Sequence, residues 1–276
     1  MLSHDRFDAA LTRFCTEVPA LYDGDWASSR ALVEARRYGL AVLIAHLNGP
    51  GAERATTKMQ MVALCERKGL ALRRSVEGAI DTLVAAGFVR MGDVAGDRRA
   101  RAPLPTERLL AHFRRSLACR LGCVGEVLPL PEPSAALAAR REAVPALLRA
   151  DVELLFARHV KLHDDVPAVR FFTERLMGFF VMLELLRRGS VAGADGPFAF
   201  QTTGLAERLC VSRSHLENML RAAADAGIVR IEGRRRLALP LATLRTLRTA
   251  VAIELAWTAR HQGLAMTGPD GNASTE

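Results

Sequence analysis

The sequence predicts a mainly α-helical protein that carries two small β-hairpins and is built as a pseudo-twofold internal repeat. The hydrophobic content is 50% but the aromatic content is only 5%, and a core of aliphatic side chains is typical of packed helices rather than of a β-sandwich. The chain also repeats itself after 140 residues, which indicates two copies of one structural unit. In each copy, helical periodicity gives way to a strand, a polar turn and a second strand.

The internal repeat is clearest over one stretch of each half. Arg73–Arg90 reads RRSVEGAIDTLVAAGFVR and Arg213–Arg230 reads RSHLENMLRAAADAGIVR, with six identical positions. Conservative pairs such as Ile80 with Leu220 occupy further positions. Apolar helical patterns flank both stretches, so that residues 37–49 correspond to 177–189 and residues 104–121 to 244–261.

The repeat divides the chain into four predicted parts. They are an N-terminal unit with flanking helices, a proline-rich joint with a linker helix, a C-terminal unit and a disordered tail, at residues 1–128, 129–168, 169–266 and 267–276. In the joint, a helix is expected over Ser134–His163, which Pro145 either kinks or restarts. The tail is assigned from its content of Gly, Asn and Ser.

The second unit has the clearer local pattern. A short helix over Gly204–Leu209 is followed by a tight turn, and Ser212 is suited to cap the next helix because its hydroxyl accepts a backbone N–H. Gly227 can end that helix with a positive φ. Its inward face is formed by Leu216, Leu220 and Ala223. Short strands at residues 228–231 and 237–239 complete the order of a winged helix-turn-helix, in which the hairpin is called the wing.

The first unit repeats this order with two departures. Helices are expected over 61–68 and 72–86, a strand over 88–91 and a longer wing tip over 92–101. The turn between the helices has one extra residue, and Leu72 stands where Ser212 caps the second copy. Since leucine has no acceptor, the helix is expected to begin less firmly, by about 1 kcal/mol.

The run Val84–Thr106, VAAGFVRMGDVAGDRRARAPLPT, resembles the wing region of the MarR family of winged-helix regulators. The resemblance covers about 65 residues of the first unit and implies that Asp97 braces the wing while Arg99 reaches the DNA minor groove or backbone. Thr106 matches the threonine that opens the next helix, with Pro105 in place of the expected leucine. A usual member has one such unit and dimerises, whereas this chain has two.

The charge of the chain favours a polyanionic partner. The formal net charge is +8, and the basic residues are almost all arginine, with only three lysines, Lys58, Lys68 and Lys161. Arginine pairs with guanine and asparagine with adenine in the major groove, and arginine on hairpin tips suits phosphates. Double-stranded DNA is therefore the expected partner, with single strands disfavoured because aromatic stacking residues are scarce.

The predicted DNA-contacting residues are the outward residues of the second helix in each unit. They are the positions that remain when the inward apolar positions are set aside. On these helices the predicted contacts are Arg73, Arg74, Ser75, Glu77, Arg213, Ser214, His215, Asn218 and Arg221. On the two wings they are Arg98, Arg99, Arg101, Arg234, Arg235 and Arg236. His215 is assigned to the edge of the outward face. If the helix were rotated about its axis by one residue, His215 would point outward in place of Ser214.

No catalytic residue, cofactor or metal site is predicted, since the chain has no phosphate loop, nucleophile elbow or paired carboxylates. Cys119 and Cys123 with His112, and His159 with His163, are the candidates for metal or redox sites. Buried thiols and the end of a helix are the preferred interpretations. With no secretory segment and no apolar stretch long enough to span a bilayer, a cytoplasmic, nucleoid-associated protein without membrane partners is expected.

The function predicted from the sequence is sequence-specific binding of double-stranded DNA that regulates transcription, at an imperfect palindrome. Two alternatives stay open: a plasmid-type replication initiator with tandem winged helices, and a winged-helix scaffold that binds protein. A homodimer is possible in each case, and the sequence leaves a small-molecule effector undecided. The apolar helices over 38–47 and 171–186 are expected to pack together as the core between the units.

Overall fold

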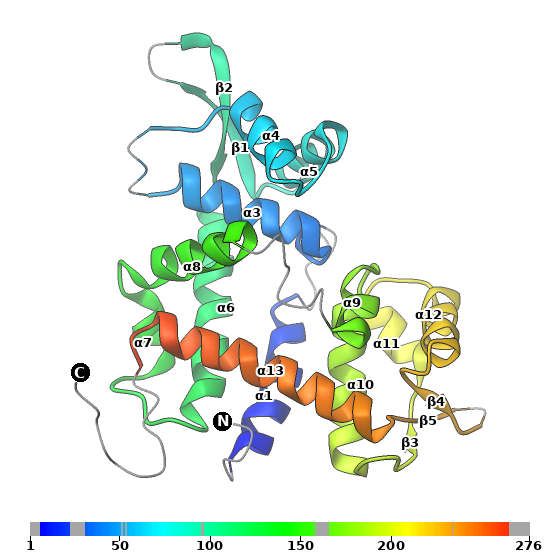
Figure 1. Cartoon of the computed structure of the whole chain (residues 1–276). Helices are drawn as coiled ribbons and strands as arrows, with labels where there is room; N and C mark the ends of the chain where they lie inside the picture. Colours follow the sequence, from blue (N-terminus) through cyan, green and yellow to red (C-terminus); the bar gives the residue numbers. More distant parts are fainter. Residues whose placement is uncertain are drawn as a thin grey trace.

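The computed structural model describes residues 6–22, 31–50, 52, 54–94, 97–157, 166–233 and 235–264. This part of the chain is mainly helical with two small antiparallel sheets, so the predicted fold class is confirmed at this level (Figure 1). The tail at 267–276 lies outside the described residues. None of the described helices is long and apolar enough to cross a membrane.

The first unit has the predicted order of elements. They are α3 (Ala35–Asn48), α4 (Lys58–Arg67), α5 (Arg73–Ala85), β1 (Val89–Val94), β2 (Asp97–Pro105) and α6 (Glu107–Gly125). The two strands pair from Val89 with Pro105 to Val94 with Asp97. The expected long wing tip over 92–101 is therefore wrong, because the strands extend to within two residues of each other along the chain. Alternating burial along β1 gives this extension one sheltered face.

The second unit follows the same order with one more strand. Its elements are α10 (Gly178–Ala192), β3 (Phe198–Ala199), α11 (Thr202–Arg208), α12 (Arg213–Asp225), β4 (Arg230–Ile231), β5 (Arg236–Ala238) and α13 (Leu241–His261). The strand β3, which was not predicted, pairs with β5 to give the order β3-β5-β4. The helices α5 and α12 begin and end at positions 140 residues apart, as the repeat predicts.

The ends of these helices follow their capping chemistry. The Ser212 hydroxyl accepts the N–H of His215, as predicted, and Gly227 ends α12 with φ 69°. Leu72 makes no side-chain cap at α5. The Glu66 carboxylate compensates in part, because its Oε1 accepts the N–H of Arg73 at 3.2 Å.

Two segments that were expected to be single helices are each divided into two. The joint helix is broken into α7 (Ser134–Ala139) and α8 (Ala143–Ala157), so Pro145 lies in the first turn of a restarted helix. The apolar stretch over 171–186 is not one helix, since α9 (Pro167–Thr173) ends before α10 begins. Met177 turns the chain there with φ 61°. At Gly178 a Cβ would lie 2.0 Å from the carbonyl oxygen of Phe172, so the turn requires glycine.

The core consists of two clusters, and each takes in helices from the other end of the chain. The first helix, α1 (Phe7–Ala20), contacts α10 and buries Phe7, Leu11 and Phe14 in the cluster of the second unit. Conversely, α8 contacts α3 and buries its apolar face in the cluster of the first unit. The helix α8, which leads into the second unit, thus packs on the first, whereas α1 lies between α6 of the first unit and α10 of the second (Figure 1).

This packing corrects one expectation. Core packing crosses the expected boundaries at residues 128 and 168, because α1 contributes to the cluster of the second unit and α7 and α8 to that of the first. The helices α3 and α10 were expected to pack together, yet they lie in different clusters. The two units are also joined by the contact between α6 and α13, where Arg120 Nη1 lies 2.8 Å from Glu254 Oε1.

Candidate nucleic-acid interface

The helix α12 divides cleanly into a buried and an exposed face. Leu216, Leu220 and Ala223 are buried as predicted, and Met219, which was not assigned, is buried with them. The exposed face carries Arg213, Ser214, Asn218 and Arg221, with Glu217 half-buried beside them. The helix therefore presents a continuous polar surface that starts at its N-terminus.

Neighbouring side chains on this face of α12 contact one another. Arg213 Nε lies 2.6 Å from Glu217 Oε1, one turn further along. Arg221 donates a hydrogen bond of 3.1 Å to the side-chain oxygen of Asn218. That bond leaves the Asn218 amide N–H groups able to donate elsewhere, since an amide has separate donor and acceptor atoms.

His215 lies at the edge of the exposed face and is half-buried. Its ring donates a hydrogen bond from Nε2 to the carbonyl oxygen of Leu176 at 3.0 Å, so it points toward the segment between α9 and α10. The edge position expected for His215 is therefore observed, with Ser214 exposed beside it, and a role of His215 in DNA contact stays a prediction. The bond is tertiary, because the segment that accepts it lies 39 residues away in sequence.

The helix α5 presents the corresponding surface in the first unit. Arg73, Arg74, Ser75 and Gly78 are exposed and Glu77 is half-buried. Arg73 lies between two carboxylates, with its guanidinium 3.9 Å from Glu77 and 4.0 Å from Glu66. These are loose surface pairs, which bind an arginine weakly and leave it available to a stronger anion.

The hairpin of β1 and β2 is held by a pair that sequence reasoning missed. Arg101 Nε lies 3.5 Å from Asp93 Oδ1, and Arg101 also donates to the carbonyl oxygen of Met91 at 3.0 Å. Asp93 and Arg101 are opposite each other in the strand register, which only becomes visible once the hairpin is known to be long. Arg99 is exposed on the same strand. The side chains of Asp97 and Arg98 lie outside the described part, so the expected Asp97 brace remains a prediction.

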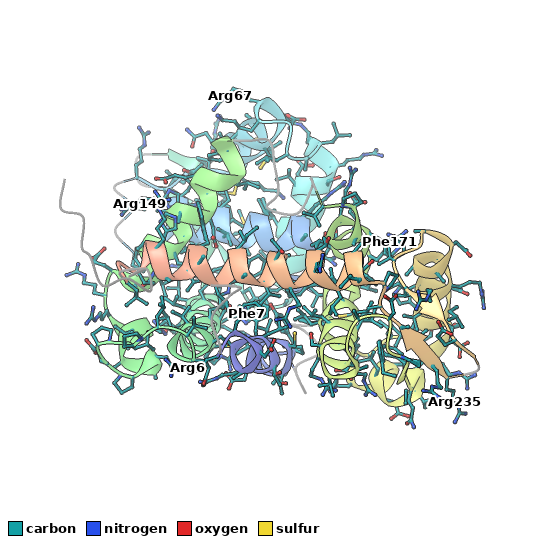
Figure 2. All side chains as sticks on the ribbon, turned by 60° about the horizontal axis from the view of Figure 1, so that its bottom comes forward. Arg6, Phe7, Arg67, Arg149, Phe171 and Arg235 are labelled. Carbon is teal, nitrogen blue, oxygen red and sulfur yellow. The ribbon has the colours of Figure 1, made fainter. Side chains whose placement is uncertain are left out.

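The hairpin of β4 and β5 is shorter and exposes its arginines. Arg235 and Arg236 are exposed, and Arg235 lies at the outer edge of the second unit in Figure 2. Arg236 donates a long hydrogen bond of 3.4 Å to the carbonyl oxygen of Pro197. Arg230 is held between Asp195, at 2.9 Å, and Glu232. Arg234 lies outside the described residues.

Each of the two helices lies beside an arginine-bearing hairpin of its own unit. In Figure 1, α5 lies in the upper part of the molecule and α12 at the lower right, and the hairpin of β1 and β2 extends upward while β4 and β5 lie at the lower right. In both units the helix is followed directly by its hairpin, at positions 140 residues apart for α5 and α12.

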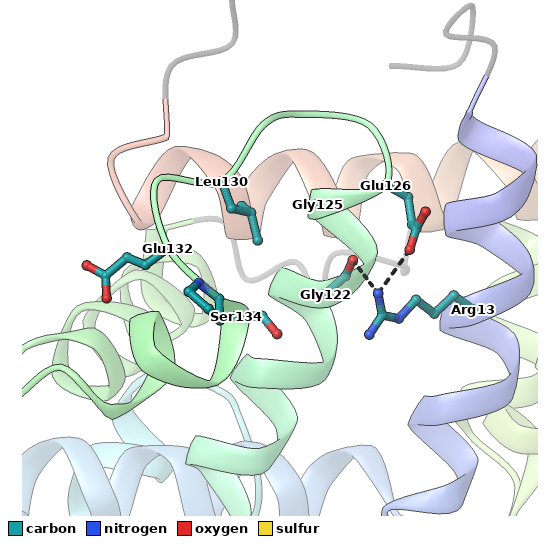
Figure 3. A pocket seen from close by; sticks show the side chains of 8 residues that line it. Arg13, Gly122, Gly125, Glu126, Leu130, Glu132 and Ser134 are labelled. Carbon is teal, nitrogen blue, oxygen red and sulfur yellow. Dashed lines mark hydrogen bonds and ion pairs between the residues drawn. The ribbon is translucent and has the colours of Figure 1, made fainter.

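A hollow near the C-terminal end of α6 has a volume of about 460 Å³. Its cation, Arg13, already donates to the carbonyl oxygen of Gly122 at 3.1 Å and pairs with Glu126 at 3.0 Å (Figure 3). The same arginine is also paired with Glu17 at 2.8 Å. With its donors engaged in this way, Arg13 braces α1 against α6.

The described cysteines and histidines do not form a metal site, since no group of three potential ligands is found among the described residues. A hydrogen bond with Cys119, together with burial, raises the pKa of the Cys123 thiol. Burial raises the pKa of Cys15 to about 12. These thiols are therefore protonated at neutral pH and poorly reactive. His159 and His163 lie outside the described residues.

No protein-family model matches this chain, and neither a curated protein nor a solved structure matches it. A function therefore has to follow from the arrangement of the side chains themselves.

Proposed function

We propose that the protein is a sequence-specific double-stranded DNA-binding regulator of transcription that carries two winged helix-turn-helix units. One observation carries the proposal: two equivalent helices, α5 and α12, begin with arginine, expose polar faces, and are each followed by an arginine-bearing hairpin. The strand β3 pairs with β5, so that β3, β5 and β4 form one sheet. This sheet supports the winged-helix assignment of the second unit.

The chemistry of the exposed residues suits a duplex. The N-terminal residues of a recognition helix reach base edges in the major groove, and Arg73, Arg74 and Arg213 stand at the starts of α5 and α12. Arginine binds guanine through two hydrogen bonds, and Asn218 has the donor and acceptor that adenine requires. The hairpin arginines, such as Arg99 and Arg235, would contact phosphates or the minor groove and contribute affinity without sequence preference.

The packing of the leading helices supports a pseudo-twofold arrangement. In a symmetric dimer each subunit packs its elements on the other, and here α1 packs on α10 just as α8 packs on α3. One chain would then present two heads, as a dimer of single-unit proteins does. Its site would be a short imperfect palindrome with half-sites roughly one helical turn, about 10 base pairs, apart. The half-sites would differ because Gly78 and Asp81 stand where the second unit has Asn218 and Arg221.

The proposal is tested by selecting duplexes from a random pool with the full chain and measuring the stoichiometry on the selected site. One chain should protect both half-sites of an imperfect palindrome. The variant with Arg235→Ala and Arg236→Ala should weaken binding to all sequences and lower the slope of log affinity against log salt by up to about 2, one unit for each lost phosphate contact.

The matched control removes the same charge elsewhere. Arg140 and Arg141 lie between α7 and α8, on the opposite side from α5 and α12 in Figure 1, and their replacement by alanine should leave the salt slope unchanged. A chain that enriches no duplex, or an equal loss of slope in the two double variants, would contradict DNA binding through this surface. If a second chain is needed for the second half-site, the pseudo-dimer interpretation is wrong.

A further inference from the structure

A strained turn between α9 and α10 is bonded to the start of α12. In this turn Met177 adopts φ 61° and ψ 3°, in the left-handed region that a bulky side chain seldom enters. Its side chain is buried in the cluster of the second unit, and such packing helps to hold an unfavourable backbone conformation. A second contact reaches the turn from α12, because the His215 ring donates from Nε2 to the Leu176 carbonyl oxygen at 3.0 Å.

His215 makes two hydrogen bonds that fix the first turn of α12. Its backbone N–H is bound by the Ser212 hydroxyl at 3.1 Å, which caps the helix, and its ring binds the turn before α10. Arg213 and Ser214, which we propose to face DNA, lie in the chain between Ser212 and His215. The residues at the start of α12 are therefore held between a local cap and a tertiary bond to a segment 39 residues away.

The described part of the first unit has neither the left-handed turn nor the histidine at the corresponding places. The position that corresponds to Met177 is Arg37, which lies within α3. The position of His215 is taken by the exposed Ser75. In that unit α3 contacts α5 more extensively than α10 contacts α12 in the second unit. The first unit thus holds its helix by direct helix packing, whereas the second unit adds a side-chain bond to a turn.

We propose that His215 is a positioning residue, which fixes the orientation of α12 through the Leu176 carbonyl and thereby sets the base preference of the second half-site. This inference rests on the proposed function, because it requires α12 to enter the major groove. A recognition helix reads bases with the residues near its N-terminus, so a small rotation of α12 would displace Arg213 and Asn218 together. The histidine acts through these neighbours and needs no base contact of its own.

Two variants of equal reach test the hydrogen bond. In His215→Gln, the side-chain nitrogen lies as many bonds from the backbone as Nε2 of histidine does, and it can still donate. In His215→Met, a methyl group occupies that place and no donor remains. Glutamine and methionine have similar helix propensities, so the two variants differ mainly in their ability to bind the Leu176 carbonyl.

Hydrogen exchange in the free protein measures the bond without DNA. The backbone N–H of Gly178 is bound within the turn by the Arg175 carbonyl at 2.9 Å. In His215→Met this amide should exchange about five-fold faster than in the wild-type chain, the effect of losing one hydrogen bond that holds the turn closed. In His215→Gln it should exchange at the wild-type rate.

Affinities for duplexes with single base changes measure the effect on recognition. On the duplex selected by the wild-type chain, His215→Met should lose about five-fold in discrimination at several base pairs of the second half-site, and none in the first. His215→Gln should keep the wild-type discrimination in both half-sites. The first half-site is the internal control, because a general loss of folded protein would weaken both.

Three results would overturn the positioning role and leave the proposed function intact. The first is an unchanged exchange rate and unchanged discrimination in His215→Met. The second is faster exchange with unchanged discrimination, because the bond would then hold the turn without orienting α12. The third is lost discrimination in His215→Gln at the wild-type exchange rate, which would assign the imidazole a base contact. A wild-type chain that selects no duplex would instead overturn the proposed function, and the positioning role with it.

Discussion

Each of the two equivalent helices begins with a different capping residue. At α12 the Ser212 hydroxyl accepts the N–H of His215 at 3.1 Å. At α5 the corresponding Leu72 has no acceptor, and Glu66 reaches the first N–H from the preceding helix instead. The start of α12 is thus capped by the hydroxyl of its own N-cap residue. At the start of α5, a backbone N–H is instead bound by a carboxylate from the preceding helix.

The capping difference predicts unequal effects of alanine at the two positions. Ser212→Ala should lower the free energy of unfolding by about 1 kcal/mol, because the N–H of His215 loses its acceptor. Leu72→Ala removes no hydrogen bond and should change the free energy of unfolding much less. Urea unfolding of the two variants measures both values. Equal losses in the two variants would contradict the expected difference between a capped and an uncapped helix start.

At the scale of the element, the first arginine of α12 pairs with a carboxylate on the same helix. Arg213 and Glu217 are one turn apart, with 2.6 Å between Nε and Oε1. The pair is largely exposed, so it contributes little to stability. A carboxylate on this face would, however, repel phosphates and compete for the arginine. In the proposed complex, this charge would limit the affinity of the helix for DNA.

This competition predicts that Glu217→Gln tightens DNA binding. The affinity should rise roughly three-fold at low salt and less at high salt, because the removed repulsion is screened. Glu142→Gln, at the exposed start of α8 and away from α5 and α12, serves as the control and should have no effect. Weaker binding of the Glu217 variant would show that the carboxylate accepts a hydrogen bond from a base rather than opposing the phosphates.

At the scale of the whole molecule, a polar cluster lies where the two units meet. Arg120 on α6 pairs with Glu254 on α13, and both are mostly buried. Burial raises the pKa of Asp151, on α8, to about 6; Glu254 adds to this rise and Arg120 opposes it. The cluster therefore joins ionisable groups from three helices, and the charge on each depends on the others.

The raised pKa of Asp151 predicts a pH-dependent stability. The folded protein holds a proton on this carboxyl that the unfolded chain, with a pKa near 3.8, releases. The free energy of unfolding should therefore fall as the pH rises from about 4 to about 6, because the unfolded state binds fewer protons. Asp151→Asn should be more stable than the natural chain by about 1 to 2 kcal/mol at pH 7.5 and nearly equal to it at pH 4.

Urea unfolding at the two pH values measures this difference. The control is Asp225→Asn, which removes a carboxylate that is exposed at the end of α12. If the Asp151 variant is less stable at pH 7.5, the ionised carboxylate stabilises the cluster through Arg120 more than its burial opposes folding. That result would reverse the sign of the effect.

Much of the local structure could be predicted from the sequence. The order of helices and hairpins, the bounds of α5 and α12, the Ser212 cap and the turn at Gly227 follow from periodicity and capping chemistry, which act over a few residues. The exposed arginines of both helices follow for the same reason. The outward faces were found by subtracting apolar positions, and this works wherever a helix has one buried side.

Only the tertiary structure decided which elements pack against each apolar face. Periodicity shows that α1 and α8 each bury one face, but it does not show that α1 packs between α6 and α10 or that α8 packs on α3. The same holds for His215, whose partner is the Leu176 carbonyl, and for Asp93, whose pairing with Arg101 depends on the strand register. The physical reason is that an apolar face lowers its free energy against any complementary surface. The sequence pattern therefore determined which faces are buried. The packing of segments distant in sequence determined which element covers each of them.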